Sequence, residues 1–218
     1  MALSRHAVRW PVIARGAPAG ILLAPVLVMV AIAAAVLAFE QMALGALTLP
    51  FGLAFLAILF FFRDPRRVIG AGVVSPADGR VLVADPAAGR LAIFMGVSDV
   101  HVNRAPIGGV VLRQTHRPGG FAIASGPESA SNERLVWEIE TRFGPLELTQ
   151  VAGIFARRIV PYVRPGDKVK KGQRIGLVRF GSRVELVLPP GCRLVVAVGD
   201  RVRAGASTIA EVQDGLGP

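Results

Sequence analysis

Three polar residues in separate segments, Asp78, His101 and Ser182, are of the types that together activate a hydroxyl group. A serine hydroxyl is a weak nucleophile at its ordinary pKa and needs a base within hydrogen-bonding reach. A histidine and a carboxylate can provide that base when the fold brings them together, whatever their order along the chain. The residue types therefore allow nucleophilic chemistry at Ser182.

Two of these residues also have an ordinary structural explanation. Gly181 and Ser182 interrupt an apolar stretch, VRFGSRVELVLP, that otherwise has the pattern of a β-strand. A glycine there usually marks a bulge, a tight bend or a close approach of two backbones. Asp78 lies in the sequence PADG, where an aspartate commonly stabilises the turn through its own side chain. From these residues alone, a structural role explains Gly181, Ser182 and Asp78 as well as a catalytic role does.

His101 lies in the sequence SDVHVN, in which polar and apolar residues alternate. The alternation places Asp99, His101 and Asn103 on one face of a strand, which is also typical of an ordinary half-exposed strand. His116, in the sequence THRPGG, is a second candidate base. His6 lies in the basic N-terminal arm and is not expected to take part.

The N-terminal part of the chain contains two apolar segments, residues 19–39 and 42–62, each about long enough to cross a bilayer. Neither holds a charged residue, and only Glu40 and Gln41 separate them. A secretory signal peptide would have one shorter apolar region followed by a cleavage site. We therefore expect a hydrophobic α-helical hairpin that either spans the membrane or, because its turn is so short, is re-entrant.

Arginines flank both ends of this hairpin and place both ends on the cytoplasmic side of the cell membrane. They are Arg5, Arg9 and Arg15 before it and Arg63, Arg66 and Arg67 after it. The net charge of +10 suits an anionic membrane surface. With one tyrosine and two tryptophans the chain offers few stacking platforms for bases, so we expect no nucleic-acid partner.

From residue 73 onward, short apolar runs alternate with Gly, Pro and Asp, and we expect a mostly β domain. Two segments, PGDKVKKG from Pro165 and VGDRVRAG from Val198, share the frame GD-x-V-x-x-G. Each predicts a turn, a buried valine and a sharp return at the second glycine. The frame resembles the hairpins of lipoyl and biotinyl carrier domains and related barrel-sandwich folds. The position of the carrier's lysine holds Gly181, Ser182 and Arg183 instead.

Three segments in order, SPADGRV (75–81), FMGVSDVHVNRAP (94–106) and FGSRVELVLP (180–189), resemble the short-chain branch of the phosphatidylserine decarboxylases. The segments FFRDPRR, ASNERL and VAGIFARRIV add to the match. The resemblance covers about residues 60–213 by motif and the hairpin by position. A Gly-Ser dipeptide alone is common, whereas this ordered set is specific.

The resemblance implies a proenzyme that cleaves itself by serinolysis. The hydroxyl of Ser182 would attack the carbonyl of Gly181, and elimination of the resulting ester would split the chain into a β chain (1–181) and an α chain (182–218) that form a heterodimer. Ser182 would become a covalent pyruvoyl group. Asp78 and His101 would activate Ser182. Long-chain members have a second histidine where this chain has Arg104, which leaves His116 as a competing base.

The implied activity is the decarboxylation of phosphatidylserine, a membrane phospholipid, to phosphatidylethanolamine and CO2. The pyruvoyl group would form a Schiff base with the substrate amine and accept electrons as CO2 leaves. His101 would help to protonate the product carbanion. Arg104 and Asn103 would bind the headgroup. The other headgroup candidates are Arg157, Arg158 and Arg183. No metal is expected, since the three histidines lie in separate segments.

The predicted organisation is a basic arm (1–18), a membrane helical hairpin (19–62) and a mostly β catalytic domain with lipoyl-like, barrel-sandwich-like hairpins (63–218). An alternative from another class is a membrane-anchored lipoyl-like carrier or adaptor without enzymatic activity, which would stay one polypeptide. A pyruvoyl enzyme for a soluble amino acid would leave the membrane segments unexplained. The acyl-chain preference and any higher oligomer stay open.

Overall fold

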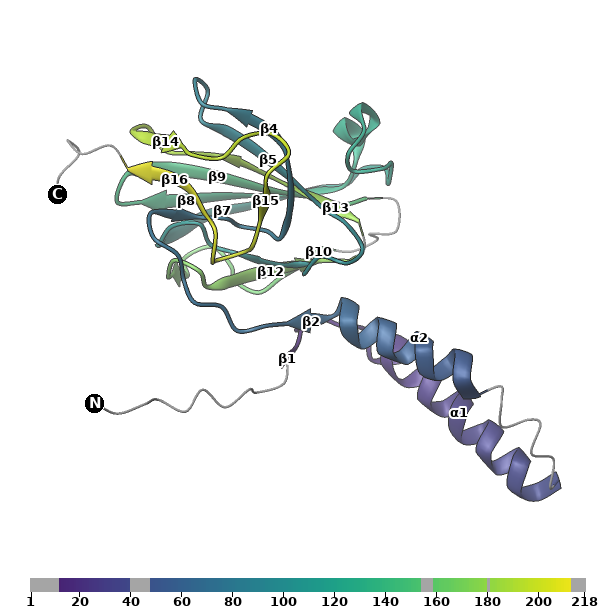
Figure 1. The fold of residues 1–218 in the computed structure, drawn as a ribbon. Helices are drawn as coiled ribbons and strands as arrows, with labels where there is room; N and C mark the ends of the chain where they lie inside the picture. The colour runs from purple at the N-terminus through teal and green to yellow at the C-terminus, as the bar shows by residue number, and fades with distance from the viewer. Residues whose placement is uncertain (1–11, 40–47, 154–158, 180, 213–218) are drawn as a thin grey trace, which may run out of the picture. The chain divides into compact units, whose positions relative to one another are not determined.

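The computed structural model describes residues 12–39, 48–153, 159–179 and 181–212. The chain forms two compact units, Met1–Arg66 and Arg67–Pro218, which we describe separately (Figure 1). The second unit therefore begins slightly later than the catalytic domain predicted from residue 63. His6, Arg157 and Arg158 lie outside the described residues.

The first unit contains the two apolar helices that the sequence predicts. Helix α1 (Ala19–Phe39) packs beside α2 (Thr48–Phe61), and the short strands β1 (Val12–Ile13) and β2 (Arg63–Asp64) pair antiparallel (Figure 1). At 1.5 Å per residue, α1 is about 31 Å long and can cross a bilayer by length and composition, while α2 is about 21 Å long. The predicted turn at Glu40 and Gln41 lies outside the described residues.

The second unit is mostly β, as predicted. Its strands are β3 (Val73–Val74), β4 (Gly79–Asp85), β5 (Arg90–Met95), β6 (Val102–Arg104), β7 (Gly109–Arg117), β8 (Arg134–Thr141), β9 (Gly144–Val151), β10 (Ile159–Pro161), β11 (Lys168–Val169), β12 (Arg174–Val178), β13 (Ser182–Val187), β14 (Cys192–Leu194), β15 (Arg201–Val202) and β16 (Thr208–Val212). One 3-10 helix, η2 (Pro127–Ser131), lies between β7 and β8.

These strands form one large sheet and two small ones, with antiparallel pairing throughout the named strands (Figure 1). The large sheet has the order β11-β7-β8-β9-β13-β5-β4-β15, and the small sheets are β10-β12-β6 and β14-β16-β3. Strand β13 alternates between buried and half-buried residues, because one of its faces packs on the core. The largest fully buried core side chains of the central strands are Leu91, Ile93, Met95, Trp137, Ile139, Leu146, Leu148 and Leu186.

The internal repeat predicted from the sequence is present. Its two copies contain the short strands β11 and β15, and their valines, Val169 and Val202, are buried. All four glycines of the frame have a positive φ, a conformation that only glycine adopts at little cost. These glycines are Gly166 (+92°), Gly172 (+76°), Gly199 (+98°) and Gly205 (+74°). The glycine spacing therefore fixes the shape of both hairpins.

The structure adds a second repeat that we did not predict. The two hairpins bind equivalent segments, 105–111 and 75–81, through the same backbone hydrogen bonds. The matched N–H to carbonyl bonds are Gly166 to Val111 (2.8 Å) and Gly199 to Val81 (2.9 Å), and Gly172 to Ala105 and Gly205 to Ser75 (both 2.8 Å). The second unit thus contains two similar halves, in which Asp78 corresponds to Gly108.

Cys192, the chain's one cysteine, starts β14 and packs against the hydrophobic core. Burial raises the pKa of its thiol, because the charged thiolate loses solvation. The side chain therefore serves as the small apolar filler that the sequence suggested.

The two repeat glycines Gly166 and Gly199 allow a direct test of this backbone account. A Cβ at either position would meet no atom within 4 Å, so an alanine would cost only the strain of the positive φ. We expect Gly166→Ala and Gly199→Ala each to lower the free energy of unfolding in urea by about 1–2 kcal/mol. Gly126→Ala is the control, with a φ of −91° and a nearest contact of 3.6 Å. Its effect should stay within about 0.5 kcal/mol, and equal stability of all three variants would contradict the account.

Candidate active site

Ser182 is the first residue of β13, where it pairs with Met95 of β5. Its side chain is 0% exposed, and its Oγ has no hydrogen-bond partner among the described residues. The preceding residue, Gly181, has a φ of +54°, so the predicted interruption is a sharp bend just before the strand. A buried hydroxyl without a partner is rare in proteins and costs stability. Ser182 is therefore a candidate nucleophile.

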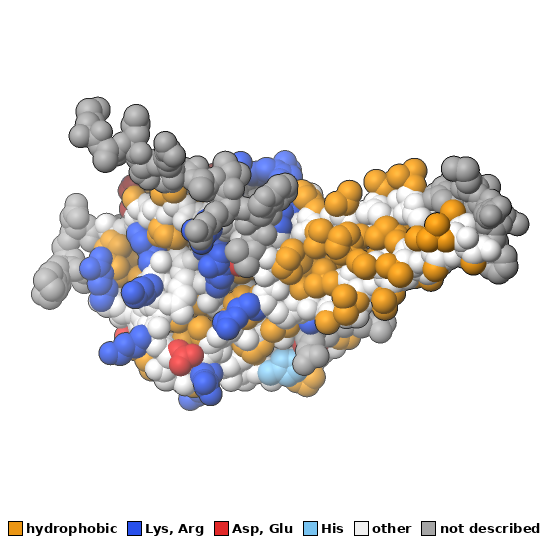
Figure 2. All heavy atoms as spheres, turned by 90° about the horizontal axis from the view of Figure 1, so that it is seen from below, with side chains coloured by type: hydrophobic (Ala, Val, Ile, Leu, Met, Phe, Trp, Pro, Cys, Tyr) orange, Lys and Arg blue, Asp and Glu red, His pale blue; other side chains and the backbone are white. Residues whose placement is uncertain are grey.

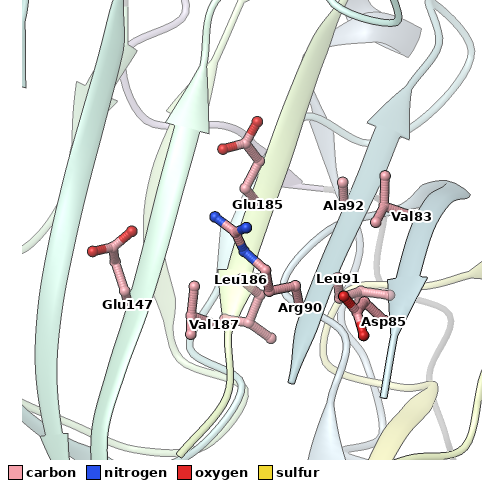
Figure 3. A pocket seen from close by; sticks show the side chains of 9 residues that line it. All are labelled: Val83, Asp85, Arg90, Leu91, Ala92, Glu147, Glu185, Leu186 and Val187. Atoms are coloured by element: carbon pink, nitrogen blue, oxygen red, sulfur yellow. The ribbon is translucent and has the colours of Figure 1, made fainter. Parts of the chain in front are cut away.

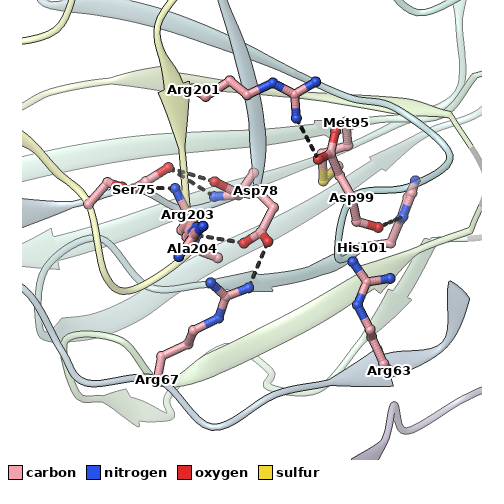
Figure 4. A network of polar contacts seen from close by, with 12 residues as sticks. Arg63, Arg67, Ser75, Asp78, Met95, Asp99, His101, Arg201, Arg203 and Ala204 are labelled. Carbon is pink, nitrogen blue, oxygen red and sulfur yellow. Dashed lines mark hydrogen bonds and ion pairs between the residues drawn. The ribbon is translucent and has the colours of Figure 1, made fainter. Parts of the chain in front are cut away.

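His101 lies beside the segment that carries this serine. The N–H of Val178 donates to the carbonyl of His101 over 3.2 Å, and Ser182 pairs with Met95, so both ends of residues 178–182 are tied to residues 95–101. The His101 side chain is buried, and its Nδ1 lies 2.9 Å from the backbone carbonyl of Asp99 (Figure 4). A carbonyl only accepts, so Nδ1 carries the proton and Nε2 is the basic nitrogen of the neutral ring.

Asp78 is 8% exposed and forms an ion pair that the sequence analysis did not predict. Its Oδ2 lies 2.7 Å from Nη2 of Arg67, and its Oδ1 accepts the N–H of Ala204 over 2.7 Å (Figure 4). In the sequence, Arg67 was marked only as part of FFRDPRR and as one of the arginines that flank the hairpin. The predicted action of Asp78 on His101 and Ser182 stays a prediction.

The other half of the repeat has no carboxylate where Asp78 lies. The equivalent residue there is Gly108, and several flanking backbone hydrogen bonds match, whereas the bond from the Ala204 N–H to Asp78 Oδ1 belongs to this half. A buried ion pair such as Asp78 with Arg67 is also weak support for stability, because desolvation opposes the attraction. The buried carboxylate and its ion pair with Arg67 therefore occur in one half of the repeat.

A chain of buried polar groups supports Met95, the pairing partner of Ser182. Trp137 Nε1 donates to Gln150 Oε1 (2.9 Å), Gln150 Nε2 donates to Asn103 Oδ1 (2.7 Å), and Asn103 Nδ2 donates to Met95 Sδ (3.3 Å). All are fully buried. Trp137 and Gln150 have no signal in the sequence that would mark them as partners of the site.

Two predicted headgroup ligands, Asn103 and Arg104, are buried in the structure. Asn103 takes part in the chain just described, and Arg104 Nη1 donates to the carbonyl of Gly172 over 3.1 Å. Their predicted role at the substrate headgroup therefore stays a prediction.

His116, the competing base, lies on β7 with its side chain 54% exposed and its Nε2 3.0 Å from Glu133 Oε1. Across the sheet, His116 faces Leu135, which faces Gln150, which faces Val184 of β13. Three strand spacings, about 14 Å, separate His116 from β13. His116 is therefore far from β13, whereas His101 lies in a segment that is hydrogen-bonded to residue 178.

A groove of about 300 Å³ crosses β4, β5, β9 and β13 (Figure 3). Arg90 lies among three carboxylates in it, those of Asp85, Glu147 and Glu185. This excess of negative charge does not suit an anionic phosphate, so we do not assign the lipid headgroup to it. Among the described residues, no group of three or more His, Cys, Asp or Glu side chains could hold a metal ion.

Comparison with known proteins gives the family. The family model described as phosphatidylserine decarboxylase matches residues 55–210. A phosphatidylserine decarboxylase proenzyme of Streptomyces coelicolor is 53% identical over 156 residues, which cover 70% of this chain and 72% of the relative. A relative from Nitrosomonas eutropha with the same description is 44% identical over 176 residues, 75% of this chain and 82% of its own.

An archaeal protein is equally similar. A putative archaetidylserine decarboxylase proenzyme of Archaeoglobus fulgidus is 53% identical over 150 residues, which cover 67% of this chain and 73% of the relative. The matched regions include Asp78, His101 and the residues on either side of the Gly181 bend. The chain therefore belongs to the phosphatidylserine decarboxylase family.

Proposed function

We propose that this chain is a proenzyme that cleaves itself between Gly181 and Ser182 and then decarboxylates phosphatidylserine to phosphatidylethanolamine and CO2. The observation that carries the proposal is the buried hydroxyl of Ser182, unpartnered among the described residues, directly after the Gly181 bend. The membership of the family and the relatives' description as proenzymes support it. A carrier or adaptor would have no use for such a hydroxyl.

In the proposed cleavage, Ser182 Oγ adds to the carbonyl carbon of Gly181, and the C–N bond breaks. The acyl group thereby moves from nitrogen to oxygen, and a proton moves from oxygen to nitrogen. Removal of the Cα proton of Ser182 then expels the Gly181 carboxylate and leaves dehydroalanine at the head of the new α chain. Water then hydrolyses the imine tautomer of this dehydroalanine, so that ammonia leaves and the pyruvoyl group remains. Glycine at position 181 offers no Cβ to obstruct the attack.

The residues around Ser182 fit this reaction. His101 Nε2 would take the hydroxyl proton, with Nδ1 held by the Asp99 carbonyl, and the charge of Asp78 would favour the protonated ring. The buried Ser182 site also fits the group that would form there, because an uncharged carbonyl tolerates an environment without donors. That group supplies the electron-withdrawing carbonyl that decarboxylation of an amino acid requires. In turnover His101 would return a proton to the substrate carbon.

The first unit accounts for access to a lipid. Apolar side chains cover its helices, and Lys and Arg side chains are spread over the face of the second unit in Figure 2. Extraction of a diacyl lipid into water would cost roughly 0.8 kcal/mol per methylene, so an enzyme anchored in the bilayer has an advantage. We propose a cell-membrane location with the second unit on the cytoplasmic face, as the flanking arginines predict. The α and β chains would remain together as a heterodimer.

The activity is tested by CO2 release from vesicles that contain phosphatidylserine. We expect release from the wild type, loss of release after treatment with hydroxylamine, and no effect of chelators. Ser182→Ala should stay one chain and release no CO2, because it lacks the nucleophile. The same assay with archaetidylserine in the vesicles tests whether the lipid named for the archaeal relative is also accepted. Cleaved enzyme that decarboxylates free serine but not phosphatidylserine would contradict the proposal.

The role of Asp78 is tested by Asp78→Asn, which keeps the shape of the side chain and removes its charge. We expect self-cleavage, followed on denaturing gels, to slow by roughly tenfold or more, the equivalent of about 1.4 kcal/mol in the barrier. Asp85→Asn is the matched control, since Asp85 accepts two backbone N–H groups in an exposed turn. Cleavage of Asp78→Asn at the wild-type rate would remove Asp78 from the mechanism.

The choice of base is tested by His101→Ala and His116→Ala. General-base catalysis typically contributes a factor on the order of 100 or more, so His101→Ala should slow self-cleavage by that amount. His116→Ala should cleave at the wild-type rate, because its imidazole is exposed and about three strands from β13. The reverse pattern in a gel time course would move the role of base to His116.

A further inference from the structure

The loop between β7 and β8 contains a buried side chain, Asn132, that links the loop to the end of β9. Its Oδ1 accepts the N–H of Ala122 over 2.8 Å. Its Nδ2 donates to the carbonyl of Ala122 and to the carbonyl of Ala152, both over 2.7 Å. One amide therefore joins the loop to the end of β9. Only an amide has the acceptor and the two donors that these three bonds require.

The segments joined by Asn132 enclose the carbonyl that Ser182 is proposed to attack. Gly153, next to Ala152, lies so close to this carbonyl that a Cβ on it would be 1.7 Å from the oxygen of Gly181. The same Cβ would be 3.3 Å from the Cβ of Ala124 in the loop. The backbone at Gly153 and the loop at Ala124 thus form a wall against the scissile bond.

Arg183, the residue after Ser182, holds this wall from the other side. Arg183 is 15% exposed, and its Nη1 donates to the carbonyl of Ala124 over 2.9 Å. Its Nη2 forms an ion pair with Glu185 Oε1 at 2.6 Å. The loop is therefore held at Ala122 by Asn132, which lies just before β8, and at Ala124 by Arg183 of β13.

We infer that Asn132, assisted by Arg183, is a positioning residue for self-cleavage: it holds the wall that aims the Gly181 carbonyl at the Ser182 hydroxyl. The inference rests on the proposed function and adds residues that act without touching the reacting atoms. Attack requires the oxygen and the carbonyl carbon in a narrow range of orientations, so a small displacement of the carbonyl slows the reaction strongly. A wall fixed by three hydrogen bonds from one buried amide limits that displacement.

The test uses Asn132→Asp in the full-length chain, because this variant has the same shape but different donors. Its ionised carboxylate would face two carbonyl oxygens and repel them, whereas its protonated form could donate to one of them. Burial raises the pKa of such a carboxyl group. Near pH 8, the variant should therefore cleave at about one-tenth of the wild-type rate or less. This ratio of rates should increase as the pH is lowered to about 5.

Two controls separate positioning from folding. Ser129→Ala removes a partly buried hydrogen bond to Gly126 in the same loop without touching Ala122 or Ala152, and it should cleave at the wild-type rate. Thermal unfolding of Asn132→Asp in the Ser182→Ala background, where no cleavage occurs, reports the fold directly. If that chain does not fold, Arg183→Met takes its place, since it keeps the aliphatic stem and loses the bond to Ala124.

Slow cleavage of folded Asn132→Asp with recovery at low pH supports the inference. Wild-type cleavage of folded Asn132→Asp, or of Arg183→Met where that variant is needed, overturns it. A cleavage defect that does not change with pH also overturns it, because a loss of packing has no such dependence. Failure of the wild type to cleave would instead contradict the proposed function, so the two failures are distinguishable.

Discussion

The site depends on one costly arrangement: the hydroxyl of Ser182 is buried, without a hydrogen-bond partner in the described part of the chain, beside a carbonyl of the same backbone. The large sheet maintains it. Pairing of β13 with β5 and β9 fixes the start of the strand, and the glycine before it provides the bend. For the proposed reaction, the neighbouring elements would supply a histidine from the segment before β6 and a wall from the loop after β7 and the end of β9.

The repeated framework explains how a small mostly β domain builds such a site. Its two halves share glycine turns and backbone hydrogen bonds that involve no catalytic candidate side chain. The halves differ where Asp78 replaces Gly108, and the buried carboxylate and its arginine partner occur in one half only. The hydrophobic core, by contrast, is formed largely by apolar residues of β5, β8, β9 and β13.

Local patterns predicted the parts of the fold that local conformation controls. The two apolar helices, the β-rich domain and the glycine turns of the GD-x-V-x-x-G frame follow from composition and spacing, and the bend at Gly181 follows from a glycine in a strand pattern. The contacts between distant strands did not follow. The hydrogen bonds of Asn132 to Ala152 and of Trp137 to Gln150 depend on sheet register, and the burial of Arg104 depends on the carbonyl of Gly172. The second repeat was missed because its segments, 75–81 and 105–111, share only a proline, a glycine and a valine.

Intact-mass spectrometry of the purified wild-type chain tests the central claim most directly. The account predicts two species, residues 1–181 and a small chain from position 182 that is lighter than its unmodified sequence by the mass of ammonia and lacks a free N-terminal amine. A preparation that releases CO2 from phosphatidylserine while showing only the full-length mass would contradict it. A small chain that begins with an intact serine amine would contradict it as well.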